Sequence, residues 1–243
     1  MGERLKTIVD NYDQMKIGPD DTFRFHCTEC GKCCIHREDI LLSPNDLFRA
    51  AKALSMDTVE FYHQYCEGYI GQDSRIPIIR LRPRGSVHRC PLLKDQHCMI
   101  HKAKPAVCAM FPLGRSVALQ KGKALEEQDV KIQFILQPPT CGDLSETHTV
   151  REWVESFGME VEDPIFLQWQ TFIMTAHSAI TELEKKIPRE EMRRFWNLLT
   201  YCAYLNYDMA EDFSSQFETN MTDARNLISA YEKAAAGVSP DAG

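Results

Sequence analysis

Four cysteines between residues 27 and 34 constrain the fold of this chain more than any other feature of its sequence. They stand in FRFHCTECGKCC, where Cys27, Cys30 and Cys33 follow the spacing C-x2-C-x2-C and Cys34 comes next. Loops of the ferredoxin type use this spacing to present three thiolates to one iron–sulfur cluster. Two intervening residues, with Gly31 as a permissive turn position, let successive sulfurs reach a shared centre. The spacing therefore predicts a metal-ligated loop.

The adjacent pair Cys33 and Cys34 adds a second expectation. Neighbouring residues chelate one tetrahedral ion poorly, so their side chains are expected to diverge toward two destinations. One destination is the centre served by Cys27, Cys30 and Cys33. The second cysteine then binds a second metal or remains a free thiol. Alternatively, both cysteines serve the same centre and a different cysteine of the group is left out of it.

Four more cysteines lie on turn-forming sequence downstream. Cys90, Cys98 and Cys108 lie around the turn-forming prolines 91 and 105, and Cys141 lies in the turn-forming segment PPTCGD. Together with the first group they supply eight thiols, enough for two four-thiolate sites. The predicted metal- and cofactor-binding residues are Cys27, Cys30, Cys33, Cys34, Cys90, Cys98, Cys108 and Cys141. Their spacing leaves open which four share a centre.

The ten cysteines in 243 residues are too many for chance core thiols and too dilute for a secreted disulfide scaffold. In a reducing compartment such clusters favour metal. Cys66 and Cys202 lie on helical patterns with apolar neighbours, and we expect them to be ordinary thiols.

The cysteine pattern resembles that of the CxxCxxCC or YkgJ-type family, whose members are described as zinc- or iron-chelating and often as containing iron–sulfur clusters. The resemblance spans residues 25–142. It rests on FHCTECGKCC at 25–34, Cys90-Pro91-Leu92, Cys98 with Ile100, Lys104-Pro105 with Cys108, Phe111-Pro112 and Cys141-Gly142. The sequence departs from the family pattern at two positions: His101 stands where the family commonly has Tyr, and Lys104 where it commonly has Arg. Neither departure changes a thiolate. Flagellin lysine N-methylases carry a similar motif, which keeps a protein-modifying enzyme among the alternatives.

Charge and hydropathy exclude several classes of protein. The net charge of -7 argues against a generic nucleic-acid binder, since such proteins usually carry a basic excess. No apolar run approaches the roughly 18 residues that a spanning helix requires, and the N-terminal sequence has no apolar core of a secretory signal. We expect a cytoplasmic protein that does not enter a membrane.

One stretch departs from the acidic average. Between Arg80 and Arg115 the chain carries eight Lys or Arg against one acid, Asp95, so this stretch is +7 and the rest of the chain is -14. These cations offset a negative thiolate-rich centre, or they receive an anionic ligand or a redox partner.

The pattern of elements changes near residue 145. Before it, Ser43-Pro44 and Asp57 mark two helix starts, and Ile76–Arg84, Ser116–Leu119 and Val130–Leu136 have strand character. After it, residues 150–157 and helices starting near Pro164, Pro188 and Phe213 show apolar positions at steps of three and four. We expect an α+β fold, in which an irregular cysteine-cluster module (1–145) precedes a small helical bundle packed on it (146–236) and a frayed tail (237–243).

The cofactor expected from the spacing is an iron–sulfur cluster of the 4Fe–4S type, with thiolate-bound zinc as the alternative. The corresponding functions are electron transfer or redox sensing, protein modification, and a purely structural metal site. No nucleotide-binding, hydrolase or HExxH motif occurs in the sequence.

Overall fold

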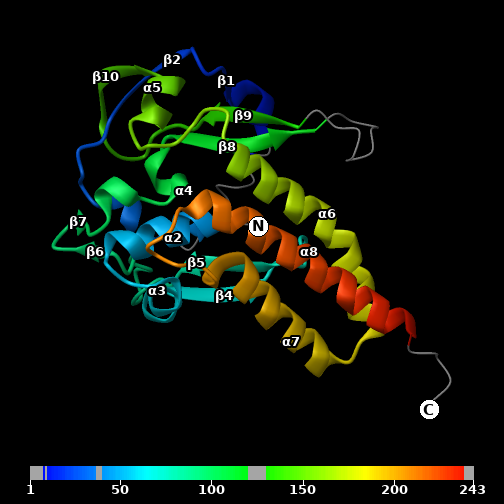
Figure 1. Ribbon diagram of the computed structural model, residues 1–243. Coiled ribbons are helices and arrows are strands. Elements are labelled where there is room, and N and C mark those ends of the chain that lie inside the picture. Colours follow the sequence, from blue (N-terminus) through cyan, green and yellow to red (C-terminus); the bar gives the residue numbers. More distant parts are fainter. Residues whose placement is uncertain (1–7, 9, 37–39, 120–129, 238–243) are drawn as a thin grey trace. The chain divides into compact units, whose positions relative to one another are not determined.

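The computed structural model describes residues 8, 10–36, 40–119 and 130–237 (Figure 1). Helices make up 49% and strands 20% of the structure, which confirms the predicted α+β class. The chain divides into two compact units, each formed by two separate stretches. We call residues 1–40 and 83–167 the cysteine unit, and residues 41–82 and 168–243 the helical unit. Among the described residues, no helix combines the length and the hydropathy that a membrane-spanning segment requires.

Small antiparallel sheets and short helices build the described part of the cysteine unit. One sheet has the order β1-β9-β8, and its strands are Lys16–Ile17, Lys131–Leu136 and Leu113–Ala118. A second pairs β10 (Asp143–Thr149) with β2 (Thr22–His26), and a third is the hairpin of β6 (Leu93–Lys94) and β7 (His97–Cys98). The helices are η1 (Tyr12–Met15), η2 (Lys32–Cys34), η3 (His101–Ala103), α4 (Ala106–Ala109) and α5 (Val150–Glu155).

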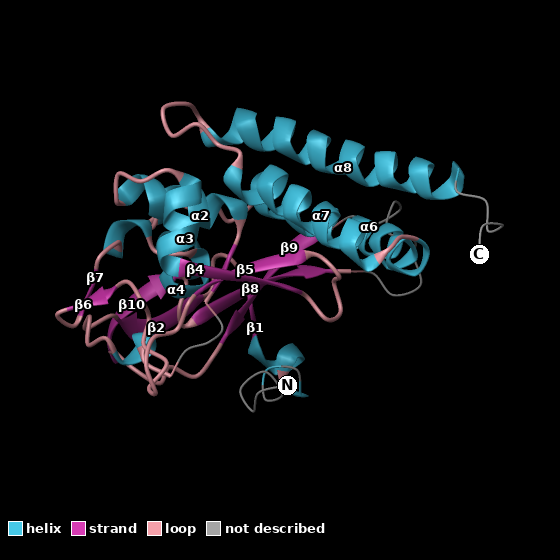
Figure 2. Cartoon of the chain, turned by 90° about the horizontal axis from the view of Figure 1, so that it is seen from below, coloured by secondary structure: helices cyan, strands magenta, loops and turns pink. Residues whose placement is uncertain are grey.

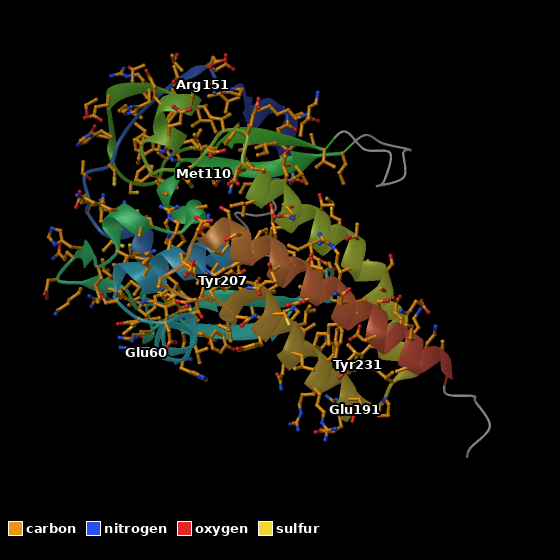
Figure 3. All side chains as sticks on the ribbon, in the orientation of Figure 1. Glu60, Met110, Arg151, Glu191, Tyr207 and Tyr231 are labelled. Atoms are coloured by element: carbon orange, nitrogen blue, oxygen red, sulfur yellow. The ribbon has the colours of Figure 1, made fainter. Side chains whose placement is uncertain are left out.

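An aromatic core holds strand β2 in place. Phe23 and Phe25 are two residues apart on this strand, so both side chains are buried on the same face. The Trp153 ring of α5 contacts both rings edge-on, at centroid distances of 6.0 and 5.6 Å. The Trp153 Nε1–H donates to the carbonyl of Met110 at 3.1 Å, and Met110 is labelled in Figure 3. Cys27 packs against the same core. Apolar packing therefore fixes the point at which the predicted metal-binding loop leaves β2.

The helical unit combines the C-terminal helices with a small sheet. Its helices are α6 (Pro164–Lys186, of which the part from Gln168 belongs here), α7 (Arg189–Thr200), a π-helical continuation η5 (Tyr201–Leu205) and α8 (Phe213–Gly237). In Figures 1 and 2, α7 runs in the opposite direction to α6, and α8 runs in the opposite direction to α7. Its sheet has the order β3-β5-β4, formed by Leu41–Leu42, Pro77–Leu81 and Cys66–Ile70, and its first helices are α2 (Pro44–Ala53) and α3 (Thr58–Tyr65).

The division into these two units differs from the single boundary expected near residue 145. Residues 41–82 belong to the same unit as the C-terminal helices. The Thr58 hydroxyl donates to the Leu205 carbonyl at 2.6 Å, and the Trp196 indole N–H donates to the Arg75 carbonyl at 3.3 Å. The Arg75 guanidinium also binds the Glu184 carboxylate of α6. These contacts span more than 100 residues of sequence, and no local pattern indicates them.

The predicted helix starts are confirmed. Ser43 and Asp46 form a reciprocal capping box on α2, and the Asp57 carboxylate accepts from the Glu60 N–H at 2.7 Å on α3. The Phe166 N–H donates to Asp163 at 2.9 Å at the start of α6. The expected strands near 76–84, 116–119 and 130–136 are β5, β8 and β9. The expected tail lies outside the described residues except for Gly237, which ends α8.

Candidate metal centre

All eight predicted ligands lie in the cysteine unit, and short elements of different kinds carry them. Cys27 directly follows β2, whereas Cys33 and Cys34 lie in η2. Cys98 and Cys108 belong to β7 and α4, and the other three occupy connecting segments. Cys66 and Cys202, which we expected to be ordinary thiols, belong to the helical unit. Burial raises the pKa of both thiols, that of Cys66 to about 12.

The pairing of β10 with β2 brings Cys141, the last of the eight predicted ligands, close to the first, Cys27. Asp143 is the partner of His26 in this antiparallel ladder, so Cys141 comes alongside the loop that begins at Cys27. Gly142 makes the approach possible. It has a φ of +72°, and a Cβ atom at this position would lie 2.4 Å from the His26 carbonyl oxygen and 2.7 Å from the Phe25 ring. Only glycine fits this conformation and this contact without a shift of the backbone.

Backbone contacts attach the loop of residues 27–34 to the downstream cysteines. Gly31, at φ +68°, initiates η2, and its carbonyl accepts from the Cys34 N–H at 3.0 Å. The Cys90 N–H donates to the Cys34 carbonyl at 2.8 Å. A Cβ atom on Gly31 would lie 3.4 Å from the Gln96 carbonyl oxygen, in the turn of the β6–β7 hairpin. The loop is thus held between Cys90 and the hairpin that carries Cys98.

The side chains of Cys33 and Cys34 do not diverge, so the expectation from sequence is wrong at this point. Their sulfur atoms lie 3.9 Å apart. Adjacent Cα atoms are only about 3.8 Å apart, and in the tight turn of η2 two short side chains can still meet.

Cys33 lies among the other predicted ligands. Burial raises the pKa of the Cys141 thiol to about 11, and the nearby Cys33, Cys30 and Cys27 raise it as well. The pKa of the Cys34 thiol is also raised, by its hydrogen bond with Cys33, by burial and by the charges of Cys90 and Cys108. For Cys98, burial raises the pKa, and Cys33 adds to the rise. The predicted ligands therefore lie in one region of the unit, in which Cys33 neighbours Cys34, Cys98 and Cys141, and Cys34 neighbours Cys90 and Cys108.

Cys30 is the exposed member of the set, and its environment favours the thiolate. The backbone N–H of Lys32 lowers the pKa of the Cys30 thiol by hydrogen bonding, and the Thr28 side chain and the Gly142 N–H act in the same direction. Sequence reasoning did not identify Thr28 or Gly142 as donors. The only available signal was Gly142 within the Cys141-Gly142 pair.

The donor set fits a thiolate-bound metal. None of the described cysteines forms a disulfide, and thiolates are the ligands that zinc and iron–sulfur clusters prefer. Among the residues that the structure describes, no three His, Cys, Asp or Glu side chains already stand in the arrangement of a single-ion site. The fit therefore rests on the chemistry of the thiols, their grouping around Cys33 and the N–H donors at Cys30.

Two of the neighbouring histidines pair with carboxylates. His26 Nδ1 lies 2.9 Å from the Glu146 carboxylate, which raises the pKa of this imidazole through a hydrogen bond. His101 Nε2 lies 3.5 Å from the Glu29 carboxylate. His97 Nδ1 lies 2.8 Å from the Asp95 carbonyl oxygen.

Comparison with known proteins finds a family model that matches the cysteine region. Residues 26–142 match the family model CxxCxxCC, described as "Putative zinc- or iron-chelating domain". The match supports metal binding by this cysteine-rich domain. Neither the curated proteins nor the solved structures gave a significant match.

Proposed function

Because residues 26–142 match the CxxCxxCC family model, we propose that this region holds an iron–sulfur cluster and that the protein acts in electron transfer or redox sensing. The observation that carries the proposal is the approach of Cys141 to Cys27, Cys30 and Cys33. Three cysteines at ferredoxin-type spacing with one distant fourth make up the usual four-thiolate set of such clusters.

The proposed ligands of the cluster are Cys27, Cys30, Cys33 and Cys141. The charges of Cys90 and Cys108 act on the Cys34 thiol. We assign these three cysteines, together with Cys98 as the remaining predicted ligand, to a second thiolate site. The backbone contact between Cys34 and Cys90 supports this grouping.

A bound iron–sulfur cluster supplies one-electron redox chemistry, and the residues around it set its potential. Here the N–H groups of Lys32 and Gly142 and the Thr28 side chain are directed at the Cys30 sulfur. Hydrogen bonds to ligand sulfur stabilise the more negative, reduced state and so raise the reduction potential. The exposure of Cys30 gives an electron a short path to the protein surface.

A structural zinc site is the second candidate, and one distance favours it. The 3.9 Å between the sulfurs of Cys33 and Cys34 is close to the separation of about 3.8 Å that two thiolates have on one tetrahedral zinc, given a Zn–S bond near 2.3 Å. In that case the metal stabilises the fold and undergoes no redox change.

Reductive titration separates these functions. We expect the anaerobically purified protein to lose absorbance at about 400 nm reversibly on addition of dithionite, and the reduced form to give an electron paramagnetic resonance signal. Iron–sulfur clusters give both responses, whereas zinc gives neither because it has no accessible second oxidation state. A protein that stays colourless and silent through the titration contradicts the redox proposal and favours zinc.

A further inference from the structure

The structure divides the basic run between residues 80 and 115. Arg80 belongs to the helical unit, where its guanidinium lies 2.7 Å from Glu67. Arg115 is 7% exposed, and its guanidinium pairs with Asp163 at 2.8 Å. Both arginines are therefore already ion-paired within the chain, and we leave them out of the candidate docking surface. The basic side chains of this run that stay in the cysteine unit, apart from Arg115, are Arg84, Arg89, Lys94, Lys102 and Lys104.

Three of these lysines lie on elements that adjoin the metal-binding loop. Lys94 is exposed in the β6–β7 hairpin, whose turn abuts Gly31. Lys102 is exposed in η3, the helix that begins with His101. Lys104 follows η3 and is half-buried, with its Nζ 5.8 Å from the centroid of the Phe157 ring, and its charge acts on the thiol of Cys98. We call Lys94, Lys102 and Lys104 the lysine face. The described acids beside it are Glu29, which lies against His101, and Asp95 in the hairpin turn.

Exposed apolar side chains accompany the lysine face. Ile35, Val87 and Met99 are 38%, 45% and 42% exposed, and Met99 directly follows Cys98. The His36 N–H donates to the Val87 carbonyl at 2.9 Å, so the segment after η2 runs beside the segment before Cys90. Apolar side chains with a charged rim are typical of small, transient protein interfaces.

We propose that the lysine face is the docking surface for the acidic face of an electron-transfer protein, which gives one electron to the metal centre or takes one from it. This inference rests on the proposed redox function. Charge complementarity identifies the partner: the surface is basic although the chain as a whole carries -7, and opposite charges speed the encounter of two proteins. The exposed apolar side chains and the small extent of the lysine face favour an acidic protein over nucleic acid, which requires a broad basic footprint.

The test compares two double variants with the same change in charge. Lys94→Gln with Lys102→Gln alters the lysine face, and Lys185→Gln with Lys186→Gln removes two exposed lysines of α6. Neither pair includes a proposed metal ligand. The first readout is the reoxidation rate of the reduced protein by stoichiometric ferricyanide, an anion, and by hexaammineruthenium(III), a cation. The second is binding of a fluorescent polyglutamate peptide, followed by anisotropy in the oxidised protein.

We expect the Lys94/Lys102 variant to react about three- to tenfold more slowly with ferricyanide at low ionic strength, and no more slowly with the ruthenium cation. It should also bind polyglutamate more weakly, whereas the Lys185/Lys186 variant should match the wild type in both readouts. Equal effects of the two variants would overturn the docking proposal alone. Tight binding of a DNA duplex that depends on Lys94 and Lys102 would overturn it in favour of nucleic acid. A protein with no reducible centre overturns the proposed function and the docking proposal together.

Discussion

Replacement of Cys30 by serine is expected to remove the metal centre and to lower the melting temperature by more than about 10 °C. A hydroxyl is a much poorer ligand than a thiolate for iron or zinc, and thiolate-bound metals contribute several kcal/mol or more to folding. Several kcal/mol correspond to a shift of about 10 °C or more in a chain of this size. Cys30 is exposed, so the loss of packing at this position is small.

The same result is expected for Cys141→Ser, which tests the distant fourth ligand. Cys202→Ser is the matched control, because Cys202 lies in the helical unit and outside the proposed sites. Metal per chain is measured by inductively coupled plasma mass spectrometry, and stability by thermal unfolding under anaerobic conditions. If Cys30→Ser retained wild-type metal content and melting temperature, the assignment of ligands would be wrong.

Gly142→Ala is expected to produce the second large effect. The new Cβ would meet the His26 carbonyl at 2.4 Å and the Phe25 ring at 2.7 Å. Backbone at this position cannot move without disturbing the β2–β10 ladder, which aligns Cys141 with the loop after His26. We therefore expect a loss of about 3 kcal/mol or more, together with reduced metal occupancy.

Gly158→Ala is the control for Gly142→Ala. Gly158 has a φ of +68°, but a Cβ there would meet nothing within 4 Å. This variant therefore reports the backbone penalty alone, about 1 to 2 kcal/mol. Urea unfolding of the two variants, with metal analysis of each, separates strain from the clash. Equal stability and equal metal content in both variants would show that the close approach of Gly142 does not position Cys141.

The sequence was informative where the chemistry is local. Cap residues at Ser43 and Asp57 mark helix starts that the structure contains, because a capping side chain and its N–H partner are three residues apart. The C-x2-C-x2-C spacing likewise identified the loop, since successive ligands of such a loop are close in sequence. The eight predicted ligands remain a prediction about metal binding, although the structure gathers them in one unit.

Longer-range features could not be predicted from one sequence. Residues 41–82 join the C-terminal helices through contacts such as that of Thr58 with Leu205, and hydrophobic periodicity does not encode which elements pack together. The approach of Cys33 to Cys34 depends on side-chain rotamers in a three-residue helix. Similarly, the role of Gly142 became visible only with the register that places Asp143 opposite His26.

Chemical analysis of the anaerobically purified, full-length protein tests the central claim most directly. Iron, zinc and acid-labile sulfide are counted per chain in the same sample. The account predicts iron and sulfide in equal amounts, at about four of each per 4Fe–4S cluster. Stoichiometric zinc without sulfide, unchanged after anaerobic reconstitution with iron and sulfide, would contradict it.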